Sequence, residues 1–240
     1  MINQDSNTYV NGIGYDIDID LTAKLQLERI EFYTENLANS SVLELGVGDG
    51  VMLSKLEGYC SRLLAIDADE TLLSNYCSKN PESKIDFKSC YFENFDTDEC
   101  FDVIHMGFIL EHVENPRILI TKFLKYLKPS GKLFISVPNA ESLHRRIGFY
   151  AGLLESVYKF SETDIKVGHV RYYDKKTLIQ DIENGGGKVI ALEGLFLKAI
   201  TTSQIEKLNL SRDVLMAFSK VGLEYPELSN SLFAVVQKKG

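Results

Sequence analysis

The chain has 240 residues, of which 45% are apolar and 25% charged, values that exclude wholesale disorder and suit one large folded domain. Its formal net charge is −8 at pH 7, and its pI is near 5.1. An acidic protein repels phosphate backbones, so we expect no nucleic-acid partner.

Short aliphatic or β-branched runs, bounded by turn residues, alternate with helical stretches along the chain. Runs of this kind predict buried strands, here at Ser41–Leu45, Arg62–Ile66, Ile85–Lys88, Phe101–Met106, Lys132–Val137, Lys188–Leu192 and Leu232–Val236. The helices expected between them are Leu21–Leu37, Thr71–Lys79, Arg117–Leu127 and Asp174–Glu183. This alternation predicts an α/β fold with a doubly wound, mostly parallel sheet, helices on both faces, and a single domain over residues 1–240.

One segment interrupts the alternation. Residues 139–173 contain no clear strand and are longer than an ordinary connection between elements. Long insertions at strand ends often form lids or binding loops. We therefore expect a helical insertion after the fifth strand that acts as a lid over the ligand-binding site.

The N-terminal stretch is polar and acidic, and no apolar run is long enough to span a membrane. The four cysteines, Cys60, Cys77, Cys90 and Cys100, lie far apart without a CxxC pair. Free thiols are typical of such spacing in a chain without a secretion signal. We expect a cytoplasmic protein with no membrane partner and no metal site.

The strongest motif joins the first predicted strand to three glycines at alternate positions, Gly46, Gly48 and Gly50. Glycines permit a tight turn and let a ligand approach the backbone. Asp67 follows 17 residues later at the end of the second strand, where a carboxylate accepts hydrogen bonds from ribose hydroxyls. Dinucleotides and S-adenosylmethionine (SAM) both use this arrangement.

Two features favour SAM over a dinucleotide. Val51 stands where the dinucleotide fingerprint has its third glycine. Glu44 and Asp49 place two carboxylates at the turn, which would repel a pyrophosphate and attract the ammonium of the SAM methionine moiety.

The segment Glu44-Leu45-Gly46-Val47-Gly48-Asp49-Gly50 resembles the SAM-binding signature of class I methyltransferases. The resemblance extends over residues 37–138, and Leu232–Val236 is similar to the family's last, antiparallel strand. It implies a seven-stranded sheet, SAM as cofactor and S-adenosylhomocysteine (SAH) as product. The implied cofactor-binding residues are Glu44, Gly46, Gly48, Asp49, Asp67, Ala68, Tyr91, Phe92 and Met106.

Beyond Pro138, segments 137–146 and 168–173 resemble bacterial small-molecule methyltransferases. This resemblance implies a small-molecule acceptor, with a hydroxyl of the sugar, nucleotide-sugar or quinone type. The adenine-contacting acid of many family members is absent near Tyr91, which leaves the adenine contact to backbone groups and Phe92.

Methyl transfer is an in-line displacement, so acceleration comes chiefly from positioning, and a base helps when the acceptor is a hydroxyl. Histidine suits that role. His169, His112 and His144 are the candidates, in that order, while His105 at the end of the fourth strand suits the core better. The side chains expected to bind the acceptor are those of Asn139, Arg145, Arg171 and Tyr172.

Two other functions remain open from the sequence. A glycine loop with a ribose acid also suits a nicotinamide-dependent reductase. A non-catalytic SAM-binding protein would keep the same fold, but we would expect it to have a damaged glycine loop. The oligomeric state and the acceptor are not indicated.

Overall fold

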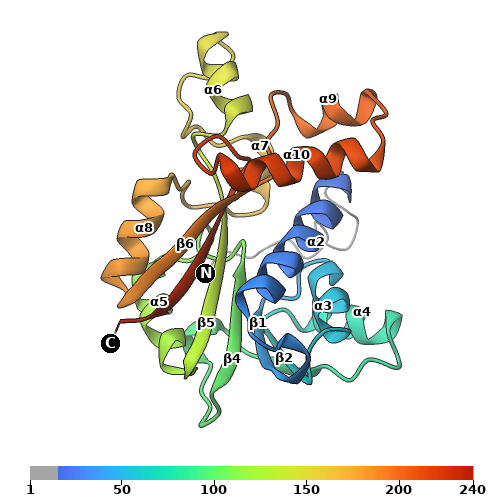
Figure 1. Cartoon of the computed structure of the whole chain (residues 1–240), viewed down its shortest axis with the longest axis vertical. Coiled ribbons are helices and arrows are strands. Elements are labelled where there is room, and N and C mark those ends of the chain that lie inside the picture. Colours follow the sequence, from blue (N-terminus) through green and yellow to red (C-terminus); the bar gives the residue numbers. More distant parts are fainter. Residues whose placement is uncertain (1–15, 240) are drawn as a thin grey trace.

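The computed structural model of the protein describes residues 16–239, with side chains from residue 19 onward. In this range seven strands form one sheet in the spatial order β3-β2-β1-β4-β5-β7-β6 (Figure 1). The neighbours from β3 to β5 are parallel, and β7 is antiparallel to both β5 and β6. The sheet therefore has the predicted doubly wound, mostly parallel architecture.

The strands are β1 (Ser41–Leu45), β2 (Arg62–Asp67), β3 (Asp86–Ser89), β4 (Phe101–Gly107), β5 (Leu127–Pro138), β6 (Gly187–Leu195) and β7 (Ser231–Lys238). The α-helices are α2 (Asp16–Tyr33), α3 (Val51–Glu57), α4 (Glu70–Lys79), α5 (Pro116–Lys125), α6 (Leu143–Tyr150), α7 (Glu162–Lys166), α8 (Lys175–Asn184), α9 (Thr202–Lys207) and α10 (Arg212–Glu224). Two short 3-10 helices are η1 (Leu37–Asn39) and η2 (Phe92–Asn94). No helix among these is long and apolar enough to cross a membrane.

All seven predicted strands are present, with ends that differ by a few residues. Three helices were not predicted: α3, α9 and α10. The prediction also extended the helix after Pro116 too far, because Leu127 already belongs to β5 and pairs with Phe101. Lys132 then pairs with Val103, so residues 128–131, which lie between the predicted helix and the predicted strand, form a bulge within β5 rather than a loop before it.

Helices cover both faces of the sheet (Figure 1). On one face, apolar side chains of α2, α3 and α4 pack against alternate strand residues such as Val42, Val103 and Phe134. On the other face, α5 and α8 pack against Leu43 and Ile104, among others. The alternation of side chains along each strand produces these two cores.

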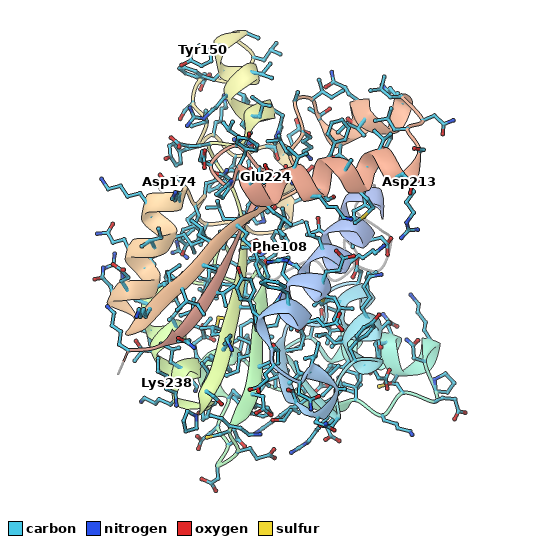
Figure 2. The ribbon with its side chains drawn as sticks, in the orientation of Figure 1. Phe108, Tyr150, Asp174, Asp213, Glu224 and Lys238 are labelled. Atoms are coloured by element: carbon cyan, nitrogen blue, oxygen red, sulfur yellow. The ribbon has the colours of Figure 1, made fainter. Side chains whose placement is uncertain are left out.

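The ends of β1, β2, β4, β5 and β6 lie at one edge of the sheet, because these strands run in the same direction. At this edge Phe108 leaves β4 with a left-handed backbone, at φ +58°, and Figure 2 places it where the strands end. A non-glycine residue adopts this conformation at a cost of about 1–2 kcal/mol. The turn sets Ile109 against the glycine loop: a Cβ on Gly46 would lie 3.0 Å from Ile109 Cδ1.

The insertion, residues 139–173, leaves the same edge after β5 and returns to it. A parallel bridge joins its first residue, Asn139, to its last, Tyr173, and the Ala140 N–H donates to the Tyr173 carbonyl at 2.8 Å. The segment contains α6 and α7 and, apart from that bridge, no strand. Helix α6 projects away from the sheet, with Tyr150 at its outer end (Figures 1 and 2).

Arg145 holds the insertion together from inside. Its side chain is buried and donates to the backbone carbonyls of Val157, at 2.8 Å, and Lys159, and to the Tyr172 hydroxyl at 3.0 Å. The guanidinium also lies 4.4 Å from the centre of the Tyr172 ring.

We expect Arg145→Met to loosen the insertion and leave the sheet intact. Hydrogen bonds from a charged donor contribute about 1.5–3 kcal/mol each, so residues 151–161 should open and be cleaved at least about tenfold faster in limited proteolysis followed by mass spectrometry. Arg146→Met is the matched control, because Arg146 is 40% exposed and pairs only locally with Glu141. Equal cleavage of the two variants would show that Arg145 does not fasten the insertion.

Candidate functional site

The glycine loop connects β1 to α3 through three residues with left-handed backbones. The φ angles are +85° at Gly46, +53° at Gly48 and +81° at Gly50, a region that side chains disfavour. Within the described part of the chain, and leaving aside Gly48 and its two chain neighbours, no atom lies within 4 Å of the position that a Cβ on Gly48 would take. The loop therefore offers an open cradle in which a ligand would approach the backbone, which fits the predicted cofactor.

Asp67 ends β2 beside this loop. One carboxylate oxygen accepts from the Val47 N–H at 2.8 Å and the other from the Asp69 N–H at 2.9 Å. Burial raises the pKa of Asp67, and these backbone hydrogen bonds oppose the rise. A carboxylate has about four acceptor positions, so Asp67 retains capacity for the two hydroxyls of a ribose.

Glu44 does not face the cofactor edge as predicted. Its carboxylate is buried and lies 2.8 and 2.9 Å from His105 Nδ1. Glu44 and His105 are register partners on β1 and β4, and they share the sheet face to which Val42 belongs. Burial raises the pKa of Glu44, and attraction to His105 opposes this. The prediction that Glu44 attracts the SAM ammonium is therefore corrected. The alternation of side chains along β1 points this carboxylate into the protein interior.

The other predicted cofactor residues divide by exposure. Ala68, Asp49 and Tyr91 are exposed at the edge of the sheet, and the Asp49 carboxylate accepts from the Val51 N–H at 2.9 Å at the start of α3. Phe92 is half-buried against the core, whereas the Met106 side chain is fully buried in it. Only the backbone of Met106 is therefore placed to line a cofactor site.

A hollow of about 290 Å³ opens beside the glycine loop, between α3 and α4. It is lined by residues 47–51 and by side chains that include those of Leu72, Asn75 and Tyr76. Neither Asp67 nor Tyr91 lines it, so it is not the predicted site for ribose and adenine.

The end of the insertion is fastened to the loop after β4. The Val170 N–H donates to the Glu111 carbonyl at 2.9 Å. Arg171 donates to the carbonyls of Leu110, at 2.8 Å, of Val113 and of Glu114, at 3.0 Å. These bonds bring the insertion's His169 to the loop that carries Glu111 and His112.

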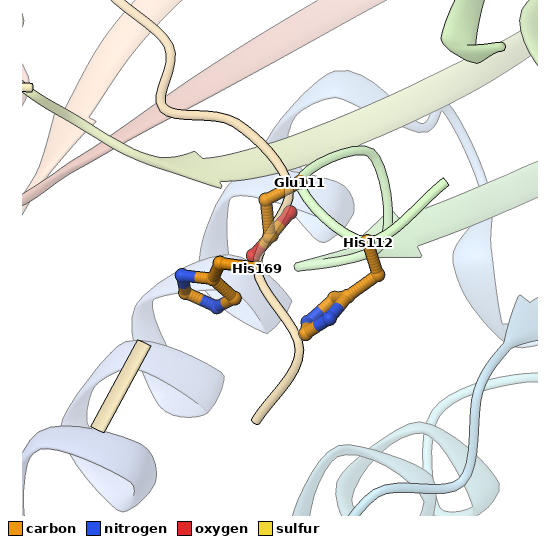
Figure 3. Close-up of side chains that lie close together, drawn as sticks. All are labelled: Glu111, His112 and His169. Carbon is orange, nitrogen blue, oxygen red and sulfur yellow. The ribbon is translucent and has the colours of Figure 1, made fainter. Parts of the chain in front are cut away.

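Glu111, His112 and His169 form a compact cluster (Figure 3). One nitrogen or oxygen from each of the three side chains lies within 4.8 Å of the others. The two imidazole rings meet edge to face, with their centres 4.8 Å apart. The structure thus joins two of the three predicted catalytic histidines, which lie far apart in sequence.

Glu111 was not among the predicted site residues. Its side chain is fully buried, and neither carboxylate oxygen has a hydrogen-bond partner within residues 16–239. Burial raises the pKa of Glu111 to about 8, so the group carries a proton at neutral pH. The available signal was a charged residue next to an apolar run, Phe108-Ile109-Leu110, which sequence reasoning did not use.

The two clustered histidines differ in their surroundings. Burial, followed by repulsion from His169, lowers the pKa of His112 to about 4, so this ring is neutral. His169 Nδ1 lies 3.1 Å from Asp164 Oδ1, close but not aligned as a hydrogen bond. Burial alone would raise the pKa of Asp164, but interactions with His169, Ser161 and Tyr172 outweigh it and hold this pKa below its usual range.

His144, the third predicted catalytic histidine, lies outside the cluster at the start of α6. Its Nδ1 is 3.2 Å from Ser142 Oγ. Burial, together with repulsion from Lys198 and Arg145, lowers the pKa of His144 to about 3. A catalytic role for it stays a prediction that the cluster does not support.

The side chains predicted to bind the acceptor have internal partners. Arg145 and Arg171 donate to the backbone carbonyls described above. The Asn139 amide donates to the Ser229 carbonyl at 2.9 Å, and the Tyr172 hydroxyl donates to Asp164 Oδ2 at 2.7 Å. Each of these side chains therefore already binds the chain itself, and its predicted contact with an acceptor stays a prediction.

A family model described as a methyltransferase domain matches residues 17–192. The chain belongs to this methyltransferase family. Together with the sheet order and the glycine loop, the match confirms the predicted class I, SAM-dependent type, with SAM as the cofactor. The nicotinamide-dependent alternative is set aside.

Curated relatives of this methyltransferase include proteins named ubiquinone biosynthesis O-methyltransferase. The one from Rickettsia conorii is 30% identical over 122 residues, covering 50% of this chain and 42% of the relative. The one from Idiomarina loihiensis is 24% identical over 202 residues, covering 82% and 81%. The chain therefore spans about half the length of the Rickettsia conorii relative.

Solved structures share the fold at low identity. A methyltransferase from Haloferax volcanii, in complex with the activator Trm112, has a TM-score of 0.68 at 14% identity and complete coverage of both chains. The N-methyltransferase NodS from Bradyrhizobium japonicum, in complex with SAH, has a TM-score of 0.55 at 17% identity, covering 90% of this chain and 88% of that one.

The pKa of Glu111 predicts an unusual pH dependence of stability. A glutamate that titrates near 8 when folded and near 4.3 when unfolded binds more protons in the folded state between these values, so stability falls as pH rises through this window. The low pKa values of His112 and His144 act in the opposite direction, but only below about pH 6.5. Between about pH 6.5 and 8, the pH dependence of stability therefore reports on Glu111 and not on the two histidines.

We expect the wild type to lose about 1–2 kcal/mol of unfolding free energy between pH 6.5 and 8, and Glu111→Gln to lose much less, because the amide has no proton to give up. Urea unfolding at three pH values in this interval measures the slope. Glu114→Gln, at an exposed position on the same loop, is the matched control and should behave as the wild type. An unchanged slope in Glu111→Gln would mean that this carboxyl is not protonated in the folded protein.

Proposed function

We propose that this methyltransferase transfers the methyl group of SAM to a hydroxyl of a small molecule, bound between the glycine loop and the insertion. One observation carries the proposal. The loop that contacts Gly46 through Ile109 also bears His112, against which the insertion sets His169. A titratable pair thus stands beside the cofactor cradle, where an acceptor must meet the methyl group.

The chain's own residues account for cofactor binding in this proposal. The backbone at Gly46 and Gly48 would hold the methionine moiety, and Asp67 would accept hydrogen bonds from the ribose. Tyr91 and Phe92 would lie at the adenine. When bound, SAM supplies a methyl group that is already electrophilic, so no covalent nucleophile of the protein is needed.

His169 is the better base of the two clustered histidines. His112, with a pKa near 4, holds a proton too weakly to take one from a hydroxyl at neutral pH. His169 has Asp164 on its Nδ1 side at 3.1 Å, a carboxylate whose negative charge would stabilise the cation formed when the ring takes a proton. His112 then serves as a neutral wall that keeps the His169 ring in place.

The relatives named ubiquinone biosynthesis O-methyltransferases support a hydroxyl of quinone or phenol type as the acceptor. A sugar hydroxyl is the runner-up, from the resemblance of residues 137–146 and 168–173 to bacterial small-molecule methyltransferases. The insertion as a lid over the acceptor and a cytoplasmic location both stay predictions.

SAM binding through the glycine loop is tested by Gly48→Val. The valine side chain would fill the open cradle and disfavour the left-handed backbone, so isothermal titration should show SAM affinity reduced at least about 100-fold. Gly152→Val is the matched control, because Gly152 is also left-handed, at φ +73°, with nothing within 4 Å of its Cβ position, but it lies in the insertion near the end of α6. Equal affinity of the two variants would remove the cofactor from this loop.

The base is tested by His169→Ala, with SAH formation as the assay over a panel of quinol, phenol and sugar acceptors. We expect kcat to fall about 100-fold or more on the acceptor that the wild type methylates, with SAM affinity almost unchanged. His144→Ala should retain turnover, since His144 lies outside the cluster. The reverse pattern would make His144 the base and contradict the role of the cluster.

A further inference from the structure

The fold buries the carboxyl group of Glu111 without hydrogen-bonding it. Both oxygens are buried and have no hydrogen-bond partner in the described part of the chain. Burying an unpaired carboxylate is costly, so such a group keeps its proton until a positive charge arrives. Unsatisfied buried groups of this kind need an explanation, and a ligand is one of them.

None of the charged and titratable groups around Glu111 in the described residues pairs with its carboxyl. His112 on its own loop is neutral, and His169 faces it from the insertion. Arg171, Tyr172 and Tyr173 follow on the same segment, and Asp164 lies on α7. The positive charge of Arg171 lowers the pKa of Glu111, but its donors go to three backbone carbonyls, and the negative charge of Asp164 acts in the opposite direction.

The loop geometry places this carboxyl close to the cofactor cradle. Ile109 touches Gly46, and Glu111 stands two residues beyond Ile109, which is at most about 7 Å of chain. A positive charge several ångströms away in a protein interior lowers a carboxyl pKa by about one to two pH units. Starting from about 8, that is enough to ionise Glu111 near neutral pH.

We propose that Glu111 releases its proton when the sulfonium cation of SAM binds, and takes up the acceptor's hydroxyl proton when methyl transfer removes that cation. The inference rests on the proposed function, because it needs SAM at the glycine loop and a hydroxyl acceptor. It assigns to Glu111 the role of proton store, with His169 as the group that first takes the proton.

The proton and the charge balance over one turnover. The acceptor oxygen forms its bond to the methyl carbon as the S–CH₃ bond breaks, and the electrons of that bond return to sulfur, which becomes neutral. The acceptor's O–H proton passes to His169. It then moves to the Glu111 carboxylate, across a spacing of at most 4.8 Å, which is short enough for one water molecule to bridge. With the cation gone, Glu111 again favours its protonated form.

Calorimetry with two ligands isolates this charge. SAM and SAH differ by one methyl group and one positive charge, so each is titrated into the full chain at pH 7 in phosphate and in Tris, whose ionisation enthalpies differ, with EDTA present. We expect about 0.4–0.8 proton released per SAM bound at pH 7, because the carboxyl pKa falls by one to two pH units from about 8, and close to none per SAH. Glu111→Gln should still bind SAM but release no proton, and Glu114→Gln should release as the wild type does.

The pH dependence gives a second readout. Between pH 6 and 7.5 the ratio of SAM to SAH affinity should rise several-fold per pH unit in the wild type and stay flat in Glu111→Gln. Equal proton release with SAM and SAH, release that persists in Glu111→Gln, or release that requires a divalent ion would each overturn the proton store while leaving the proposed function standing. Failure of the wild type to bind SAM would overturn both.

Discussion

The candidate site depends on the hydrogen bonds that fasten the end of the insertion to the loop after β4. The Val170 N–H and the Arg171 guanidinium together satisfy four carbonyls of that loop. Without these hydrogen bonds, the insertion would not hold His169 against the loop that carries His112. The same bonds exclude water from the Glu111 side chain, because they close the insertion over it. The proximity of His112 to His169 and the desolvation of the Glu111 carboxyl thus have one cause. Removing these hydrogen bonds would change both.

Arginines show what sequence reasoning left out on the acceptor side of the site. A guanidinium is a planar fork of five donors, and sequence reasoning assigned those of Arg145 and Arg171 to the acceptor. In the structure Arg145 donates to carbonyls of the insertion's irregular backbone, at Val157 and Lys159, and Arg171 donates to carbonyls of the loop after β4. Any insertion of this kind must find donors for such carbonyls, so arginines near its ends are as well suited to internal capping as to binding.

The parts of the fold that sequence predicted are those fixed by local patterns. Ser41–Leu45 matches β1 at both ends because a short apolar run between turn residues has only one good register. Helix α3 was missed because its seven residues directly follow Gly50 and carry little periodicity. At the site, the glycine loop and Asp67 are set by local backbone geometry and strand ends. The Glu44–His105 pair and the buried state of Glu111 depend on contacts between segments about 60 residues apart, which no local pattern contains.

Desolvation acts on the cluster in a way that prepares it for a cation. The same loss of water lowers the pKa of His112 and raises that of Glu111, because burial disfavours the charged form of a base and of an acid alike. Both groups are therefore neutral in the free protein. Had Glu111 instead paired with a protonated imidazole, the ion pair would have neutralised itself and left nothing for an incoming positive charge. The cost falls on stability, since a buried unpaired carboxyl is one of the few features that a conservative substitution would improve. Because the fold retains the buried Glu111 carboxyl beside the cofactor cradle, this group can release a proton when a positively charged ligand binds.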